Sequence, residues 1–67
     1  MSAVDQLLVL LLAGGGSYFT KMLAAGFSED QIREALDEAR RVGYTEATGL
    51  GADRLAEPGR QRARELR

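Results

Sequence analysis

The chain has 67 residues, of which 45% are hydrophobic and 28% are charged, and it contains no cysteine, histidine or tryptophan. This composition is typical of one small globular domain. It excludes disulfides, thiol nucleophiles, Ser/His/Asp triads and zinc sites built from cysteine or histidine. A domain of this length has a thin hydrophobic core, to which a partner subunit could add.

The charges are nearly balanced in number but segregated along the chain. Nine Lys and Arg residues stand against ten Asp and Glu residues, for a formal charge of −1 at pH 7. The chain therefore lacks the basic excess of an autonomous nucleic-acid-binding domain. The middle of the chain holds the acids Glu29, Asp30, Glu34, Asp37 and Glu38, and the last fourteen residues hold Arg54, Arg60, Arg62, Arg64 and Arg67. Charge placement thus says more about the partner than net charge does.

An apolar run over residues 7–13 lies near the N-terminus. It is too short to cross a membrane, because a spanning helix needs about 20 apolar residues. A signal peptide begins with positive charge, whereas the residues before this run include Asp5 and no Lys or Arg. We therefore expect a cytoplasmic protein with no membrane contact. The initial Met1 favours a complete small protein.

The first predicted helix spans residues 2–13, with Ser2 as its N-cap and a run of glycines at its end. Its apolar positions follow helical spacing and form one broad face: Val4, Leu7, Leu8, Leu11 and Leu12. Val9 and Leu10 fall outside this face. They could form the interface of a homodimer, or the C-terminal segment of the same chain could cover them.

Two further helices are predicted around a glycine. The first covers residues 17–25, is capped by Ser17 or Thr20, and ends at Gly26 in the left-handed conformation. The second covers residues 28–42 and opens with a capping box, Ser28 to Gln31, beside a hydrophobic staple of Phe27 and Ile32. Its buried face is expected to hold Ile32, Ala35, Leu36 and Ala39.

Beyond Gly43 the sequence period changes, and residues 44–56 are predicted to form a small β-hairpin. Its tip would carry Leu50 between two glycines. Pro58 and Gly59 indicate another turn, followed by a final helix over residues 59–67. The hairpin is expected to close a three-helix core filled by Leu8, Leu12, Leu23, Ile32 and Leu36.

This order of elements resembles a winged helix-turn-helix. Gly26 has the position of the turn, with Ile32 six residues later, and residues 32–44 resemble a recognition helix with its glycine exit into the wing. Residues 53–60 are similar to the second wing strand and the opening of the last helix in MarR-like and PadR-like regulators. The resemblance covers almost the whole chain.

What the resemblance implies is one domain over residues 1–67, mostly α with a small β-hairpin: a three-helix core, a wing and a C-terminal helix. Met22 and Ala56 depart from the family pattern at positions that concern packing. The resemblance also implies a DNA-binding transcriptional regulator that acts as a homodimer on double-stranded DNA. Its DNA-contacting residues would be Gln31 and Arg33 as base readers, with Lys21, Arg40, Arg41 and Arg54 at phosphates.

The charges of the third helix favour a second function. Its groove-facing positions include Glu29, Asp30, Glu34 and Asp37, which would oppose counterion release from DNA. This acidic face, over residues 28–41, could instead dock a basic protein partner, together with Leu50. It could also be a solvated surface with ion pairs from Glu29 to Arg33 and from Asp37 to Arg41, and the arginines near the C-terminus could be a solvated helix end.

Paired carboxylates such as Glu34 with Asp37 or Glu38 could act as acid and base, or bind a hard cation. No second ligand-bearing segment accompanies them, and the chain is too small to enclose an ordinary substrate. We therefore expect a self-associating binding module with no catalytic residues, metal or cofactor.

Overall fold

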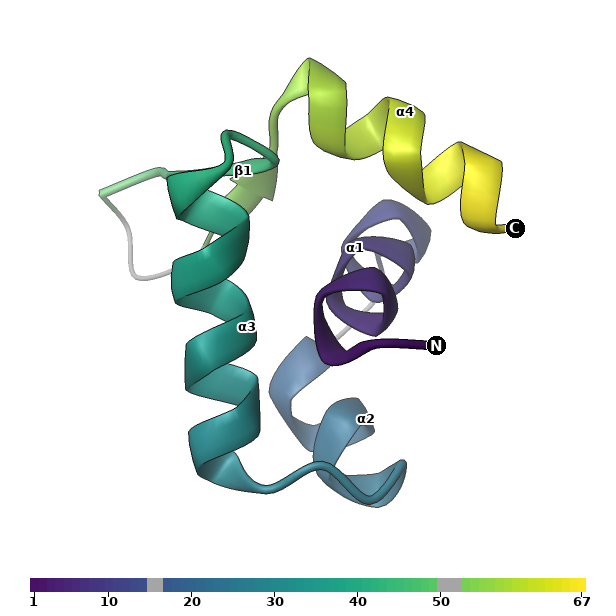
Figure 1. Ribbon diagram of the computed structural model, residues 1–67, viewed down its shortest axis with the longest axis vertical. Coiled ribbons are helices and arrows are strands. Elements are labelled where there is room, and N and C mark those ends of the chain that lie inside the picture. The colour runs from purple at the N-terminus through teal and green to yellow at the C-terminus, as the bar shows by residue number, and fades with distance from the viewer. Residues whose placement is uncertain (15–16, 50–52) are drawn as a thin grey trace.

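The computed structural model describes residues 1–14, 17–49 and 53–67. Its elements, in chain order, are α1 (Ala3–Ala13), α2 (Tyr18–Ala24), α3 (Glu29–Arg41), β1 (Thr45–Ala47), β2 (Asp53–Leu55) and α4 (Glu57–Leu66). Figure 1 shows α1 at the centre, with α3 along one side and with α2 and α4 at opposite ends. The prediction of a mostly helical chain with one small hairpin is confirmed.

Serine caps begin the first three helices. Ser2 and Ser17 each accept a hydrogen bond from the backbone N–H three residues later, at 3.2 and 3.4 Å. At α3 the capping box is complete: Ser28 Oγ accepts the Gln31 N–H at 3.1 Å, and Gln31 Oε1 accepts the Ser28 N–H at 2.7 Å. These side chains satisfy backbone donors that a helix start leaves without partners. The predicted caps at Ser2 and Ser28 are confirmed, and of the two candidates for the second helix, Ser17 is the cap.

Glycines end α2 and α3. Gly26 and Gly43 have φ values of 101° and 85°, in the left-handed region that a side chain disfavours. After α3 the Tyr44 N–H donates to the Ala39 carbonyl at 2.8 Å, and the Gly43 N–H donates to the Arg40 carbonyl at 3.1 Å. This pair of bonds is a Schellman motif, and it turns the chain from α3 into β1.

The last helix begins earlier than predicted. α4 starts at Glu57 rather than at residue 59, with Ala56 as an extended N-cap that makes no side-chain cap bond. Pro58 and Gly59 lie in the first helical turn instead of forming a separate turn. Proline is compatible with this position because the first N–H groups of a helix have no intrahelical acceptor.

Gly59 lies against the backbone at the start of the hairpin. It is buried, and a Cβ atom added to it would lie 2.1 Å from the Tyr44 carbonyl oxygen and 3.1 Å from a methyl group of Leu55. The same Tyr44 oxygen accepts the Ala56 N–H at 2.9 Å. The first turn of α4 can therefore approach β1 this closely only because residue 59 has no side chain.

The core consists of two clusters on either side of α1. One contains Leu7, Met22, Ile32, Ala35 and Ala39, and the other contains Leu8, Leu55 and Ala63. The adjacent residues Leu7 and Leu8 point about 100° apart and belong to different clusters, so α1 packs against α2 and α3 through one part of its surface and against β2 and α4 through another.

The expectation that Leu23 fills the core is wrong. Its side chain is 42% exposed, whereas its neighbour Met22 is fully buried. Successive residues on a helix point about 100° apart, and the side of α2 that faces the core is the one that carries Met22. Its flexible side chain packs in the cluster with Leu7 and Ile32. Leu8 and Ile32 are buried as expected, while Leu12 and Leu36 are only partly buried.

Candidate binding surfaces on α3 and α4

The outward side of α3 is acidic. Asp30, Glu34 and Asp37 are exposed and lie at positions i, i+4 and i+7, on the side opposite the buried face of the helix. None of the three makes an ion pair within the described residues. We call these three residues the acidic face. Glu29 is also exposed, in the first turn of α3.

The two predicted base-reading residues differ in their availability. The side-chain oxygen of Gln31 is occupied by the Ser28 N–H in the capping box. A bidentate contact with adenine needs both the oxygen and the nitrogen of the amide, so it would break this cap. Arg33 is exposed and makes no ion pair in the described part of the chain, so the expected pair with Glu29 is absent there. Lys21 is exposed as well.

Arg40 joins the end of α3 to the hairpin instead of projecting freely. Its Nε and Nη2 donate to the two carboxylate oxygens of Asp53 at 2.7 and 2.6 Å. The Asp53 side chain is 2% exposed, and that of Arg40 is 44% exposed. The hydrogen bond from Arg40 lowers the pKa of Asp53 against the opposing effect of burial. A phosphate could contact Arg40 only through the guanidinium donors that Asp53 does not use, unless it displaced the buried carboxylate from its partner.

This pair makes stability depend on pH with a definite sign. The pKa of Asp53 lies below its ordinary value of 3.8, so its ionised form stabilises the fold above that pH, and the contribution is lost as the pH falls through the folded-state pKa. Asp53→Asn is expected to lower the free energy of unfolding at neutral pH by about 1–3 kcal/mol. Urea titrations of both proteins should show this difference shrink as the pH falls below 3.8 and through the lowered pKa of Asp53.

A control for Asp53→Asn is Glu34→Gln, which removes an exposed carboxylate in the middle of α3 that has no ion pair within the described residues. It should change stability by less than about 0.5 kcal/mol. Equal effects of the two substitutions, or a difference for Asp53→Asn that does not change with pH, would show that the pair with Arg40 does not hold the hairpin.

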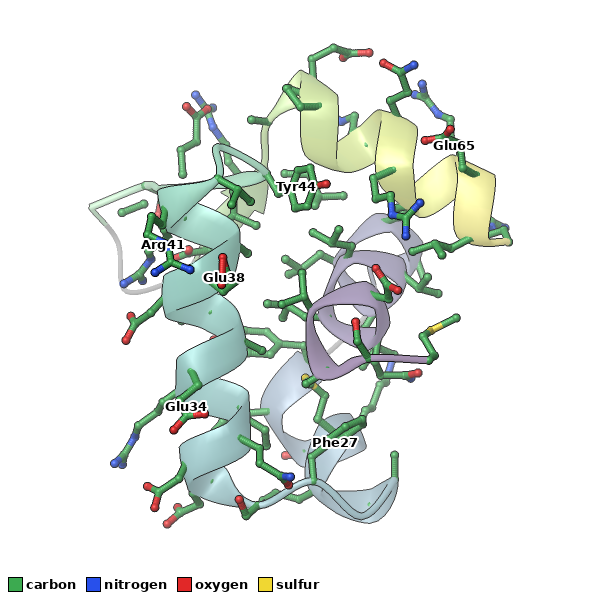
Figure 2. The ribbon with its side chains drawn as sticks, in the orientation of Figure 1. Phe27, Glu34, Glu38, Arg41, Tyr44 and Glu65 are labelled. Carbon is green, nitrogen blue, oxygen red and sulfur yellow. The ribbon has the colours of Figure 1, made fainter. Side chains whose placement is uncertain are left out.

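Arg41 and Arg54 are also paired with carboxylates. Both oxygens of Glu38 accept from Arg41 Nη2, so the predicted pair of Arg41 with Asp37 is wrong (Figure 2). Glu38 lies three residues before Arg41, and its side chain is one methylene longer than that of Asp37, which lies four residues before. Arg54 donates from Nε to Glu46 at 2.7 Å, directly across the two strands. Both pairs are exposed, so each contributes little to stability.

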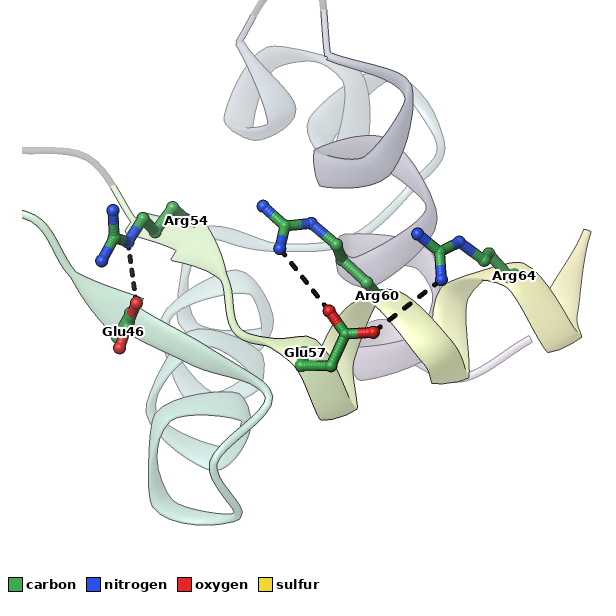
Figure 3. A network of polar contacts seen from close by, with 5 residues as sticks. All are labelled: Glu46, Arg54, Glu57, Arg60 and Arg64. Carbon is green, nitrogen blue, oxygen red and sulfur yellow. Dashed lines mark hydrogen bonds and ion pairs between the residues drawn. The ribbon is translucent and has the colours of Figure 1, made fainter.

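A second charged surface lies on β2 and α4. Figure 3 shows Arg54, Arg60 and Arg64 along one side of these elements, and we call these three residues the arginine row. Glu57 lies 3.8 Å from Arg60 and 4.0 Å from Arg64, beyond hydrogen-bond distance. The sequence indicated a concentration of arginines in this part of the chain, and the i, i+4 spacing of Arg60 and Arg64 places those two on one side of a helix. It did not predict that Arg54 of β2 lies in line with them.

The predicted dimer residues on α1 are both partly buried. Leu10 packs against the cluster that contains Met22 and Ile32, so α2 and α3 contribute to its cover rather than the C-terminal segment alone. α4 lies on the other side of α1, through Leu8 and Ala63. Val9 and Leu10 therefore do not form a fully exposed apolar patch. The predicted contact at Leu50 falls outside the described residues.

Comparisons with protein-family models, curated proteins and solved structures find no match for this chain. Within the three described segments, no group of three or more carboxylates is placed to hold a metal ion. Over the same segments, no helix has the length and apolar character that crossing a bilayer requires. The two charged surfaces are therefore the features from which a function can be argued.

Proposed function

We propose that this protein is a small binding module of the winged-helix type, which docks a basic protein surface through the acidic face of α3. The observation that carries this proposal is the line of Asp30, Glu34 and Asp37, which are exposed and free of ion pairs within the described residues. The winged-helix assignment is supported by the order of the elements, with a glycine turn between α2 and α3 and a hairpin before α4.

The same electrostatics disfavours α3 as a DNA-reading helix. DNA binding gains most of its affinity when cations replace the counterions of phosphates. On α3 three carboxylates would face the phosphates, while Arg40 and Arg41 are held by Asp53 and Glu38. A basic protein surface has the opposite requirement, because its Lys and Arg side chains would meet exposed carboxylates that make no ion pair within the described residues.

Sequence-specific DNA binding as a homodimeric transcriptional regulator is the second candidate. It is favoured by the element order of a winged helix and by Lys21 and Arg33, which are exposed and make no ion pair in the described part of the chain. In this alternative Arg33 would supply the main base contact, because the side-chain oxygen of Gln31 belongs to the capping box.

One binding experiment separates the two candidates. Fluorescence anisotropy at low salt would compare a labelled octa-arginine peptide with a labelled mixed-sequence DNA duplex, for the wild type and for Glu34→Gln/Asp37→Asn. We expect the double variant to bind the peptide about three- to tenfold more weakly, because two exposed charge pairs are lost. The matched control, Asp5→Asn/Glu65→Gln, changes the net charge equally at residues of α1 and α4 outside both charged surfaces, and it should retain wild-type affinity.

Equal peptide affinity for both double variants would overturn the proposal, because only overall charge would then matter. Micromolar duplex binding with a steep salt dependence, lost in Arg33→Ala and strengthened in Glu34→Gln/Asp37→Asn, would establish the DNA-binding candidate instead.

A further inference from the structure

We infer that the basic surface docked by the acidic face is the arginine row of a second copy of this chain. This inference rests on the proposed function, and it names the partner. It follows from the placement of two complementary surfaces on one molecule, each with charge that its own neighbours do not fully satisfy.

Many N–H donors of the arginine row are available to an outside acceptor. The side chains of Arg54, Arg60 and Arg64 are 69%, 47% and 61% exposed. Glu57 approaches Arg60 and Arg64 only at 3.8 and 4.0 Å, and Arg54 uses one nitrogen for Glu46 (Figure 3). Each guanidinium carries five N–H groups, so most donors of the row remain open to a carboxylate from outside.

The spacing of the row matches that of the acidic face. Arg60 and Arg64 lie four residues apart on α4, which puts their Cβ atoms about 5–6 Å apart. On α3, Glu34 follows Asp30 by four residues and precedes Asp37 by three, so its carboxylates recur at the same interval. Two helices laid side by side can therefore pair successive carboxylates with successive guanidiniums, and such pairs are often bidentate.

One copy cannot bring its own two surfaces together. Figure 1 shows α4 leading away from α3, with α1 and the hairpin beside them. Within the described residues, none of the ion pairs joins α3 to α4. A second copy of the chain carries an arginine row that the acidic face of the first copy can reach. The formal charge of each copy is only −1, so no strong overall repulsion opposes their approach.

The contact joins two different surfaces, so it is heterologous. Each copy that docks its acidic face on a neighbour keeps its own arginine row for the next copy. The assembly therefore grows by repeated addition and ends as a ring only if the rotation between neighbours closes. Its ion pairs are exposed and are screened by salt. Self-association should therefore be concentration-dependent and should weaken as salt is added.

A charge swap tests this arrangement. The first variant, Glu34→Arg/Asp37→Arg, makes the acidic face positive, and the second, Arg60→Glu/Arg64→Glu, makes the row negative. Each variant alone then presents two surfaces of like charge and should remain monomeric at low salt. An equimolar mixture restores opposite charges at every contact. Sedimentation velocity should therefore show the wild type and the mixture associating, and each variant alone as a monomer.

Neutral substitutions keep the test valid if a reversed variant fails to fold, as circular dichroism would show. Glu34→Gln/Asp37→Asn and Arg60→Gln/Arg64→Gln should each weaken self-association about three- to tenfold. The control Glu65→Gln alters a residue of α4 outside the row and should leave the molar mass unchanged.

Three results would overturn the inference. A wild type that stays monomeric at low salt, while octa-arginine binding still depends on Glu34 and Asp37, removes the second copy as partner but leaves the proposed function standing. If the wild type neither self-associates nor binds octa-arginine through Glu34 and Asp37, both the inference and the proposed function are overturned. Duplex DNA binding that Arg60→Gln/Arg64→Gln abolishes, without self-association, would make the arginine row a nucleic-acid surface instead.

Discussion

Gly59→Ala is expected to destabilise this protein more than a substitution on its surface, and to leave much of it unfolded. The added Cβ would lie 2.1 Å from the Tyr44 carbonyl oxygen and 2.9 Å from its carbon, far inside van der Waals contact. Both are backbone atoms, and the oxygen also accepts the Ala56 N–H. Relief of the clash would move α4 away from the hairpin and from its core contacts at Leu55 and Ala63.

We expect Gly59→Ala to lower the free energy of unfolding by about 3 kcal/mol or more, at the upper end of overpacking effects. A chain of this length has a total stability of about 3–10 kcal/mol at the usual value per residue. Urea unfolding followed by circular dichroism would measure the change. The intrinsic helix preference acts in the opposite direction, because alanine is favoured over glycine within a helix by about 0.5–1 kcal/mol.

The two effects have opposite signs: helix preference would make Gly59→Ala stabilising, and the clash with Tyr44 would make it destabilising. The sign of the measured change therefore shows which effect is larger. Gln61→Ala, at an exposed position of the same helix, serves as the control and should change stability by less than about 0.5 kcal/mol. A Gly59→Ala protein that is more stable than the wild type would mean that α4 does not lie against β1.

Met22→Ala is the second substitution with a large expected effect. Met22 is fully buried in the cluster with Leu7 and Ile32, between α1, α2 and α3. Truncation of a buried side chain of this size removes its contacts and leaves a cavity, at a loss of about 2–5 kcal/mol. Thermal and urea unfolding should both show the loss.

The adjacent residue provides the control, because Leu23 is 42% exposed. Leu23→Ala should reduce stability by less than about 1 kcal/mol, although leucine and methionine are similar in size and hydrophobicity. If Leu23→Ala were the more damaging of the two, α2 would bury the opposite side from the one described. The comparison thus tests the orientation of α2 within the core.

The two charged surfaces connect this packing to function. The Arg40–Asp53 pair holds β2 to the end of α3, and Gly59 lets the start of α4 lie against Tyr44, the residue before β1. The acidic face and the arginine row therefore belong to elements that are tied together through the hairpin. Substitutions that loosen the hairpin should weaken any contact that needs both surfaces in a fixed relation.

The local sequence alone determined where most helices begin and end. The helix caps could be predicted because a cap involves residues at most three positions apart, as at Ser2, Ser17 and the Ser28–Gln31 capping box. The helix ends at Gly26 and Gly43 could be predicted because the left-handed conformation depends on the residue type at a single position. The acidic face was predicted as well, since helical spacing places Asp30, Glu34 and Asp37 on one side once the helix is known.

The way in which these elements pack against one another depends on contacts between distant parts of the chain. Helical spacing could not choose between Met22 and Leu23, because the choice depends on where α2 packs. The partners of Arg40 and Arg54 come from other segments, and the arginine row joins a strand to a helix. At Gly59 the local signal indicated a turn, while a contact with Tyr44 requires the glycine inside a helix. Such contacts join residues distant in sequence, and their energies appear only when the whole chain is folded.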